Sequence, residues 1–276
     1  MTNKLQYLGH SGWQITTGKG KILFIDPWLS GNPLAPLSID ELPAADYVLL
    51  THDHGDHAGD AVAVVNQTGA TLVGQPEIVG RYQAAGVPAD QTLGMNIGGS
   101  IDLGGVTVTM TDAYHSSETG QPAGFILTLE DGKVLYHAGD TGIHSNMATW
   151  GELYDMDLAL LPIGSHFTMD ARQAAHALKM LKAKAAIPIH YKTFPLLAQS
   201  ADEFIELAGN LARRPGFRWW NPAGSSISER HGAQVKAGNW CRIRGTIPKR
   251  KACSGVAPVG KIPSTGRGSI PSIASE

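Results

Sequence analysis

The sequence predicts an α/β fold of the layered α+β type, in which a sandwich of β-sheets carries helices on its outer faces. The first supporting observation is the order of the apolar runs. Short runs separated by Gly-rich breaks come first, and further along such runs alternate with segments of helical character. The second is composition, since 276 residues with 42% hydrophobic residues provide a large core, and 33 glycines allow many tight turns.

The chain begins with predicted strands at residues 4–8, 13–16, 21–25 and 47–50. The fourth, Tyr47-Val48-Leu49-Leu50, runs directly into a group of histidines. After that group we expect helices at 59–67 and 77–85, on either side of a short strand at 71–73.

The middle of the chain returns to strands. β-Branched residues predict a strand at 106–110. Two apolar runs, 125–129 and 133–136, form a predicted hairpin across Glu130-Asp131-Gly132. A buried strand is expected at 157–161.

The last predicted elements are two helices around a strand. Asp170 is a candidate N-cap of a helix that ends near Lys182. One face of this helix is apolar, with Ala174, Ala177, Leu178 and Leu181. A strand at 185–189 ends at His190, and a helix follows at 201–208.

Composition argues against a membrane protein or a secreted disulfide scaffold. No apolar run reaches the roughly 20 residues that span a bilayer, and the N-terminus, Met1-Thr2-Asn3-Lys4-Leu5, lacks the apolar stretch of a signal peptide. The two cysteines, Cys241 and Cys253, both lie near the C-terminus. We therefore expect a cytoplasmic protein with no membrane partner.

Charge and composition change after about Leu211. Residues 213–276 hold 12 Lys+Arg and 2 Asp+Glu, a charge of +10. This leaves 22 − 12 = 10 basic and 24 − 2 = 22 acidic residues in 1–212, a charge of −12. The later segment is rich in Gly, Pro and Ser without a sustained period, so we expect it to be disordered. The sequence thus predicts one domain, 1–212, and a basic tail, 213–276.

A shift of reading frame would explain this tail. Its segment Phe217-Arg218-Trp219-Trp220-Asn221-Pro222 contains two adjacent tryptophans, each encoded by the single codon TGG. With CGG for Arg218 and AAC for Asn221, a shifted frame reads Val-Val-Glu-Pro, which is a strand followed by a turn. We hypothesise that residues from about Arg213 are translated out of frame. A natural basic extension is the alternative, and the nucleotide sequence of the gene decides between them.

A dense group of metal-binding side chains lies within six residues, namely His52, Asp53, His54, Asp56 and His57. In an extended segment alternate side chains share a face, so His52 and His54 can bind one metal ion. A turn at Gly55 then lets Asp56 and His57 face a second position. Imidazole suits Zn, Fe, Ni or Cu, and a carboxylate adds a hard oxygen ligand. The alternative is a polar loop whose histidines are merely exposed.

Thr51-His52-Asp53-His54-Gly55-Asp56-His57, which follows an apolar strand, resembles the His-x-His-x-Asp-His signature of the metallo-β-lactamase superfamily. The later ligands of that family are matched in order by His115, Asp140 and His190. Other segments resemble a group of small bacterial and archaeal metal-dependent hydrolases, most of unknown substrate: Gly9-His10-Ser11, Asp26-Pro27-Trp28, Gly31-Asn32-Pro33 and His190-Tyr191-Lys192-Thr193-Phe194-Pro195. L-ascorbate-6-phosphate lactonase is a more distant relative. The resemblance covers about residues 4–210.

The resemblance implies an αββα sandwich, two β-sheets flanked by helices, with a site for two divalent metal ions. It assigns the first ion to His52, His54 and His115, the second to Asp56, His57 and His190, and both to Asp140. Zn²⁺ is the expected metal, with Mn²⁺ and Fe²⁺ as alternatives. Three neutral ligands would leave the first ion a strong Lewis acid, and the small number of protein ligands would leave room for water.

Each outlying ligand has a plainer interpretation when it is taken alone. His115 is then a loop histidine, Asp140 a turn residue before Thr141-Gly142, and His190 a core histidine at a strand end. Their order and context relative to residues 51–57 favour the interpretation as ligands.

Further candidates surround the predicted ligands. Asp26 can orient a ligand imidazole through its second N–H, or it can cap the turn before Pro27. His10, His137 and Lys192 can contact the substrate or an anionic oxygen, or they can be structural polar groups.

The predicted reaction is hydrolysis of a small ester, lactone, amide or phosphoester by a hydroxide that bridges the two ions. Asp56 and Asp140 are the catalytic candidates, and Asp140 positions the nucleophile. Residues 1–212 contain no cysteine, so β-lactamases that use a Cys ligand are not matched.

Two alternative functions come from other classes. A nucleic-acid phosphodiesterase could use the basic tail, but the acidic balance of 1–212 argues against it because phosphate backbones need basic grooves. A metal-dependent redox protein is disfavoured because flavodiiron oxidoreductases usually have Glu where this chain has His54. We therefore expect a small-molecule substrate and no nucleic-acid partner, and the sequence leaves homo-oligomerisation open.

Overall fold

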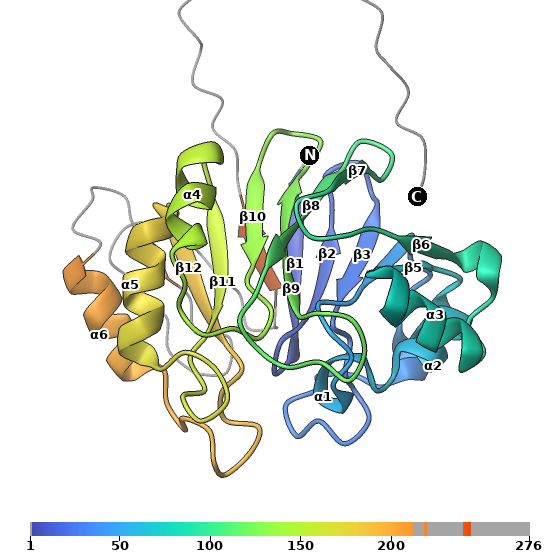
Figure 1. Cartoon of the computed structure of the whole chain (residues 1–276), viewed down its shortest axis with the longest axis horizontal. Helices are drawn as coiled ribbons and strands as arrows, with labels where there is room; N and C mark the ends of the chain where they lie inside the picture. The colour runs from blue at the N-terminus through green and yellow to red at the C-terminus, as the bar shows by residue number, and fades with distance from the viewer. Residues whose placement is uncertain (1, 212–217, 220–239, 244–276) are drawn as a thin grey trace, which may run out of the picture. The chain divides into compact units, whose positions relative to one another are not determined.

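Two mixed β-sheets dominate the computed structural model, which describes residues 2–211, 218–219 and 240–243 (Figure 1). The first sheet has the order β14-β1-β2-β3-β4-β5-β6. Its strands are β1 Asn3–Gly9, β2 Gly12–Thr16, β3 Ile22–Ile25, β4 Tyr47–Leu49, β5 Thr71–Gly74, β6 Thr92–Gly94 and β14 Trp240–Ile243.

The second sheet has the order β13-β12-β11-β10-β9-β8-β7. Its strands are β7 Ser100–Asp102, β8 Thr107–Asp112, β9 Ala123–Thr128, β10 Val134–His137, β11 Leu158–Pro162, β12 Ala185–Ile189 and β13 Arg218–Trp219. The predicted hairpin is confirmed, since β9 and β10 pair antiparallel with Leu127 opposite Leu135.

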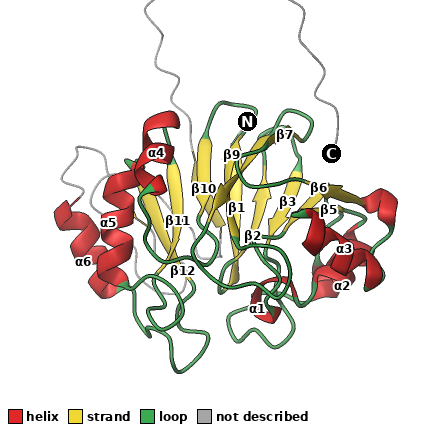
Figure 2. Cartoon of the chain, in the orientation of Figure 1, coloured by secondary structure: helices red, strands yellow, loops and turns green. Residues whose placement is uncertain are grey.

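Helices cover the outer face of each sheet (Figure 2). The helices are α1 Gly55–Ala58, α2 Ala61–Thr68, α3 Pro76–Ala84, α4 Asn146–Leu153, α5 Ala171–Leu181 and α6 Asp202–Leu211. One buried cluster fills the space between the sheets, and two others lie between a sheet and its helices: the first sheet with α2 and α3, the second with α4, α5 and α6. The αββα sandwich is therefore confirmed.

Helix α5 forms where its sequence predicts. The Asp170 side chain accepts a hydrogen bond from the backbone N–H of Gln173 at 2.7 Å, and Gln173 completes a capping box. Its four predicted core residues are buried. Helix α4 and the edge strands β6 and β7 were not predicted. Each edge strand has only three residues, and the cap residue of α4, Ser145, makes no side-chain hydrogen bond.

The parallel strands decide where the site lies. β3, β4 and β5 are parallel to one another, as are β10, β11 and β12. Their carboxyl ends and the end of β8 lead into the loops at the bottom of Figure 1, beside α1. We call this the site end of the sandwich, because every predicted metal ligand lies on these loops or on α1.

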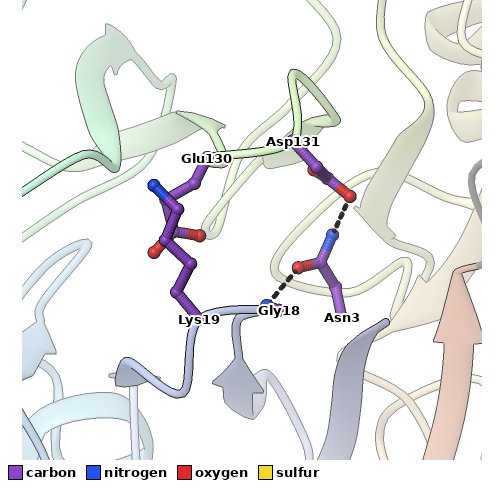
Figure 3. A pocket seen from close by; sticks show the side chains of 5 residues that line it. All are labelled: Asn3, Gly18, Lys19, Glu130 and Asp131. Atoms are coloured by element: carbon purple, nitrogen blue, oxygen red, sulfur yellow. Dashed lines mark hydrogen bonds between the residues drawn. The ribbon is translucent and has the colours of Figure 1, made fainter. Parts of the chain in front are cut away.

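The opposite end, called the far end below, is joined by polar contacts between loops (Figure 3). The Asn3 amide donates to Asp131 at 2.9 Å, and its oxygen accepts from the backbone N–H of Gly18 at 2.8 Å. Nearby, the Thr17 hydroxyl donates to Glu130 at 3.0 Å. These contacts connect the turn between β2 and β3 to the turn between β9 and β10.

The tail predicted at 213–276 is described only in part. Within it, β13 pairs parallel with β12 and β14 pairs antiparallel with β1. The expected disorder and the hypothesis of a frame shift otherwise concern positions outside the described residues. Among the helices that the structure describes, none has the length and apolar character needed to cross a membrane.

Candidate metal centre

Asp26 forms the floor of the site. It follows β3 with a positive φ of 45° and is fully buried. Its carboxylate accepts hydrogen bonds from the backbone N–H and the hydroxyl of Thr51, at 2.9 and 2.6 Å, and lies 2.8 Å from Nδ1 of His57. Burial alone would raise the pKa of Asp26, but the His57 imidazole outweighs it, so the pKa is lowered and the carboxylate stays charged. Asp26 is thus placed to orient His57.

The orientation of His52 follows from the same carboxylate. Because the Thr51 hydroxyl donates to Asp26, it can accept from Nδ1 of His52, 3.1 Å away. This tautomer, inferred from the partners, leaves Nε2 unprotonated, so that it can accept from Nδ1 of His54, 3.0 Å away, or bind a metal ion. Burial lowers the pKa of His52 to about 3, so the ring is neutral, which is the form that binds a metal ion.

A first group of imidazoles consists of His52, His54 and His115, whose ligand nitrogens lie within 4.8 Å of one another. Nδ1 of His54 is 3.0 Å from Nε2 of His52. His115 comes from the loop after β8, and burial lowers its pKa. Two segments 61 or more positions apart in the sequence thus present three imidazoles to one point.

Asp53 connects the two segments that carry this first group. Its side chain accepts hydrogen bonds from Ser117 Oγ at 2.6 Å and from the backbone N–H groups of Glu118 and Thr119 at 2.7 and 3.0 Å. Arg81 of α3 donates to it at 2.7 Å. Asp53 therefore holds the loop that contains His115 against the segment that contains His52 and His54.

A second group lies beside the first and contains Asp56, His57, His190 and His10. Asp56 and His57 belong to α1, and His190 follows β12 with a positive φ of 56°. Nε2 of His190 is 4.0 Å from the Asp56 carboxylate. Strand β12 thus brings His190 close to α1, the helix that carries Asp56 and His57.

His10 is an inner member of this second group and is fully buried. Its Nε2 lies 3.1 Å from Oδ2 of Asp56, and its Nδ1 lies 2.5 Å from the hydroxyl of Thr193. Because a carboxylate only accepts, Nε2 carries the proton and Nδ1 accepts from Thr193. Burial, reinforced by His190, lowers the pKa of His10 to about 4. The structure thus engages both ring nitrogens with protein groups.

Asp140 lies between the two groups. Its carboxylate is 2.9 Å from Nε2 of His190, 3.3 Å from Nε2 of His57 and 3.5 Å from Nε2 of His115. Burial opposes ionisation, but His190 and His57 hold the pKa of Asp140 well below its usual value. One carboxylate therefore reaches histidines of both groups.

These residues fit divalent cations. Among the described residues, His57 Nε2 and Asp140 Oδ1 are buried side-chain atoms without a hydrogen-bond partner, although they face each other. Burial lowers the pKa of His57, but Asp140 and Asp26 outweigh it and raise the pKa well above its usual value. A positive charge is thus favoured where the carboxylates of Asp26 and Asp140 converge, and a bound cation would supply one. Imidazole and carboxylate ligands are those of zinc and iron sites.

His137 and Lys192 lie differently from the other candidates. Nε2 of His137 contacts the carbonyl oxygen of Ser11 at 2.9 Å, and Nδ1 accepts from the backbone N–H of Gly139 at 3.1 Å. Neither nitrogen is left for a substrate, so His137 joins the end of β10 to the turn between β1 and β2. Lys192 is exposed on the loop after β12.

Three residues that shape the site have roles that the sequence did not predict. The Thr51 hydroxyl connects Asp26 to His52 through hydrogen bonds. Asp53 holds the loop that contains His115, and Thr193 fixes the tautomer of His10. Thr51 and Asp53 stand inside the histidine cluster, which was the available signal. The role of Thr193 has no local signal, because its contact with His10 spans 183 residues.

Comparison with known proteins places the chain among relatives. The family described as "Beta-lactamase superfamily domain" matches residues 21–191. A UPF0173 metal-dependent hydrolase of Nitratidesulfovibrio vulgaris (strain DP4) is 48% identical over 224 residues, or 80% of this chain and 92% of the relative. Igni18, a metallo hydrolase from Ignicoccus hospitalis, has a TM-score of 0.76 at 33% identity, over 89% of this chain and 100% of that one. CmlA, a diiron beta-hydroxylase from Streptomyces venezuelae, shares the fold at 12% identity with a TM-score of 0.64, over 88% of this chain and 54% of that one.

Proposed function

The chain belongs to the metallo-β-lactamase superfamily and is a metal-dependent hydrolase, and we propose that it holds two divalent ions and cleaves a small ester, lactone, amide or phosphoester. The observation that carries this proposal is the position of Asp140, within 3.5 Å of histidines from both ligand groups. His52, His54 and His115 would hold the first ion, and Asp56, His57 and His190 the second.

Two ions held in this way would lower the pKa of a shared water and polarise the scissile carbonyl or phosphoryl group. Asp140 is the carboxylate placed to orient that water and to accept its proton, because it lies within 3.5 Å of histidines of both groups. For an ester, oxygen from water bonds to the carbonyl carbon, the carbon–oxygen bond to the alcohol breaks, and the alcohol leaves with a proton. The products are a carboxylate and an alcohol, with one proton released.

The chain's residues also prepare the ligands. Asp26 holds His57 with Nε2 inward, and Thr51 does the same for His52. Hydrogen bonds of this kind fix the tautomer and direction of a ligand imidazole, and their loss typically costs about 10- to 100-fold in metal affinity or activity. We propose zinc as the metal, with Mn²⁺ or Fe²⁺ as alternatives, because the donor set suits all three.

The test combines metal analysis with a panel of generic ester, lactone, amide and phosphoester substrates. We expect two metal equivalents per chain and hydrolysis that stops on chelation and returns with metal. Asp140→Asn should lower kcat/KM by about 10²- to 10³-fold or more, whereas the exposed control Asp155→Asn should not change it. Two irons with oxygen consumption and no hydrolysis would contradict the proposal.

A further inference from the structure

Exposed apolar side chains gather at the site end of the sandwich. The described residues include seven exposed large hydrophobic side chains. Five of these lie on loops at the site end, namely Tyr114, Ile143, Phe167, Phe194 and Leu196. The other two, Leu93 and Leu153, lie on β6 and α4. Clusters of exposed apolar side chains beside a polar centre are typical of ligand-binding surfaces.

Two of the aromatic rings at this end form a defined surface. The Trp28 and Phe194 rings are stacked, with centroids 5.6 Å apart and an interplanar angle of 14°. Trp28 stands two positions after Asp26, and Phe194 four positions after His190. We call these two rings the aromatic pair. Its members come from the two loops that also carry the floor and one ligand of the metal centre.

The aromatic pair adjoins the second ligand group through His10. The His10 ring meets Trp28 edge-on at 5.3 Å between centroids and Phe194 edge-on at 5.6 Å. The centroid of the same ring lies 4.0 Å from that of His190. The aromatic pair is therefore one ring away from a predicted metal ligand, close enough for the substituent of a substrate held at the second ligand group to reach it.

The aromatic pair is held in place by the protein. The indole N–H of Trp28 donates to the carbonyl oxygen of Ser30 at 2.8 Å. Asp60, the N-cap residue of α2, fixes the loop that carries Trp28. Its side chain accepts hydrogen bonds from the backbone N–H groups of Leu29 and Ser30, both at 2.7 Å. On the other side, Thr193, next to Phe194, contacts His10. Preorganised rings bind a ligand at a lower entropic cost than mobile ones.

We propose that the aromatic pair is a substrate subsite that binds an apolar group, preferably an aryl group, beside the second metal position. This rests on the hydrolase function proposed above and narrows it to neutral esters, lactones or amides with an apolar substituent. Rings prefer offset stacking or edge contact with other rings, and burying an aryl group against them is favourable. A phosphate at the same place would lose its hydration without gaining a donor from either ring.

The test uses the full-length, metal-loaded protein and matched methyl esters, with proton release followed in a pH-stat. Methyl phenylacetate carries the aryl group, methyl acetate lacks it, and methyl phosphonoacetate replaces it with an anion. The wild type should prefer methyl phenylacetate. In Phe194→Ala the ratio of kcat/KM for methyl phenylacetate to that for methyl acetate should fall by about 10- to 100-fold, which corresponds to the burial of one large apolar side chain.

Two further variants separate the subsite from general damage. Phe194→Leu keeps an apolar surface and should give an intermediate ratio. Leu153→Ala removes an exposed leucine from α4 and should leave the ratio unchanged. An unchanged ratio in both Phe194 variants, or a preference for the anionic ester, would overturn the subsite.

Binding without turnover distinguishes failure of the subsite from failure of the proposed function. Ligand-observed NMR with benzyl alcohol should show binding to the wild type and to Leu153→Ala, and weaker binding to Phe194→Ala. Binding of this pattern without hydrolysis of any ester would contradict the proposed function and support the subsite. Hydrolysis with no dependence on Phe194 in either assay would support the function and reject the subsite.

Discussion

The two ends of the sandwich use polar residues in opposite ways. At the far end such residues satisfy one another, as Asn3 does with Asp131 and as Asp157 does with Lys133. At the site end, buried atoms of His57 and Asp140 face each other without a hydrogen bond. Unpaired buried polar groups cost free energy. The far end is thus built to stabilise the fold, and the site end keeps atoms free for a ligand.

The two ends also differ in which residues adopt a positive φ. Turns at the far end with positive φ use glycine at Gly20, Gly104, Gly105 and Gly132, and Lys182 is the exception. At the site end, residues with side chains adopt positive φ, namely His10, Asp26, Ser165, His190 and Lys192. This conformation costs residues other than glycine free energy, and it is found where function requires it. The comparison indicates that stability was given up at one end for the placement of ligands.

Among the variants that compare the two ends, Asp26→Asn, at the floor of the site, should have the largest effect. An amide cannot accept from all three donors that now point at Asp26, so His57 loses its orientation. Metal affinity should fall about 10- to 100-fold, and the free energy of unfolding should fall by roughly 3 kcal/mol. Competition with a chelator and urea denaturation measure the two quantities. Unchanged metal affinity would show that Asp26 does not orient a ligand.

Asn3→Ala tests the far end. Asn3 is buried, and its loss leaves the Gly18 N–H and the Asp131 carboxylate without their partner. The free energy of unfolding should fall by about 1–3 kcal/mol, with metal affinity and kcat/KM as in the wild type. If metal affinity also fell in this variant, the two ends would not act independently.

Asp157→Asn gives the pH dependence of the far end. Burial raises the pKa of Asp157, but the hydrogen bonds from Lys133 and the Val134 N–H outweigh it and keep the pKa below the usual 3.8. Because the pKa of Asp157 is lower in the folded protein than in the unfolded chain, its ionised form stabilises the fold at pH values above the unfolded pKa. This stabilisation is lost as the pH falls through the folded pKa. At pH 7 the variant should be less stable by about 1 kcal/mol.

The difference between wild type and Asp157→Asn should shrink toward zero as the pH falls below about 4. Asp155→Asn is the matched control, because Asp155, like Asp157, contacts Lys184, but its side chain is largely exposed. Urea denaturation at several pH values measures both variants. A difference that grows on acidification would contradict the assignment.

The smallest effect is expected at Lys182, the one residue with positive φ, other than glycine, that the described part of the chain has outside the site end. It follows α5 in the left-handed region, where glycine is usual. Lys182→Gly should stabilise the protein by about 0.5–1 kcal/mol, since it loses only an exposed contact to Glu152 at 3.8 Å. Thermal denaturation measures this gain, and destabilisation would argue against strain as the basis of the comparison.

Most of the sandwich could be predicted because its central strands are apolar runs bounded by turns. β12, for example, was predicted at its observed bounds, and α5 carries both a cap residue and an apolar face. The edge strands β6 and β7 escaped prediction because three residues contain too little periodicity. The bounds of elements shifted by one to three residues, where turns and caps decide them.

The candidate site was predictable to the extent that its residues form a pattern. The predicted ligands come together in two groups around Asp140, whose role as a bridge stays a prediction. For His10 the sequence left a contact with substrate and a structural role open, and the side chain lies buried against Asp56 and Thr193, a position that depends on the distant loop after β12. The aromatic pair is also set by tertiary contact alone. Such positions have no local signature in the sequence.

The central claim is that two metal ions lie at the site end, one in each ligand group. Elemental analysis of the purified full chain, with anomalous scattering from its crystals, tests it most directly. We predict two metal equivalents and two anomalous peaks, one among His52, His54 and His115 and one among Asp56, His57 and His190. A single equivalent with one peak in the fully loaded protein would contradict the account.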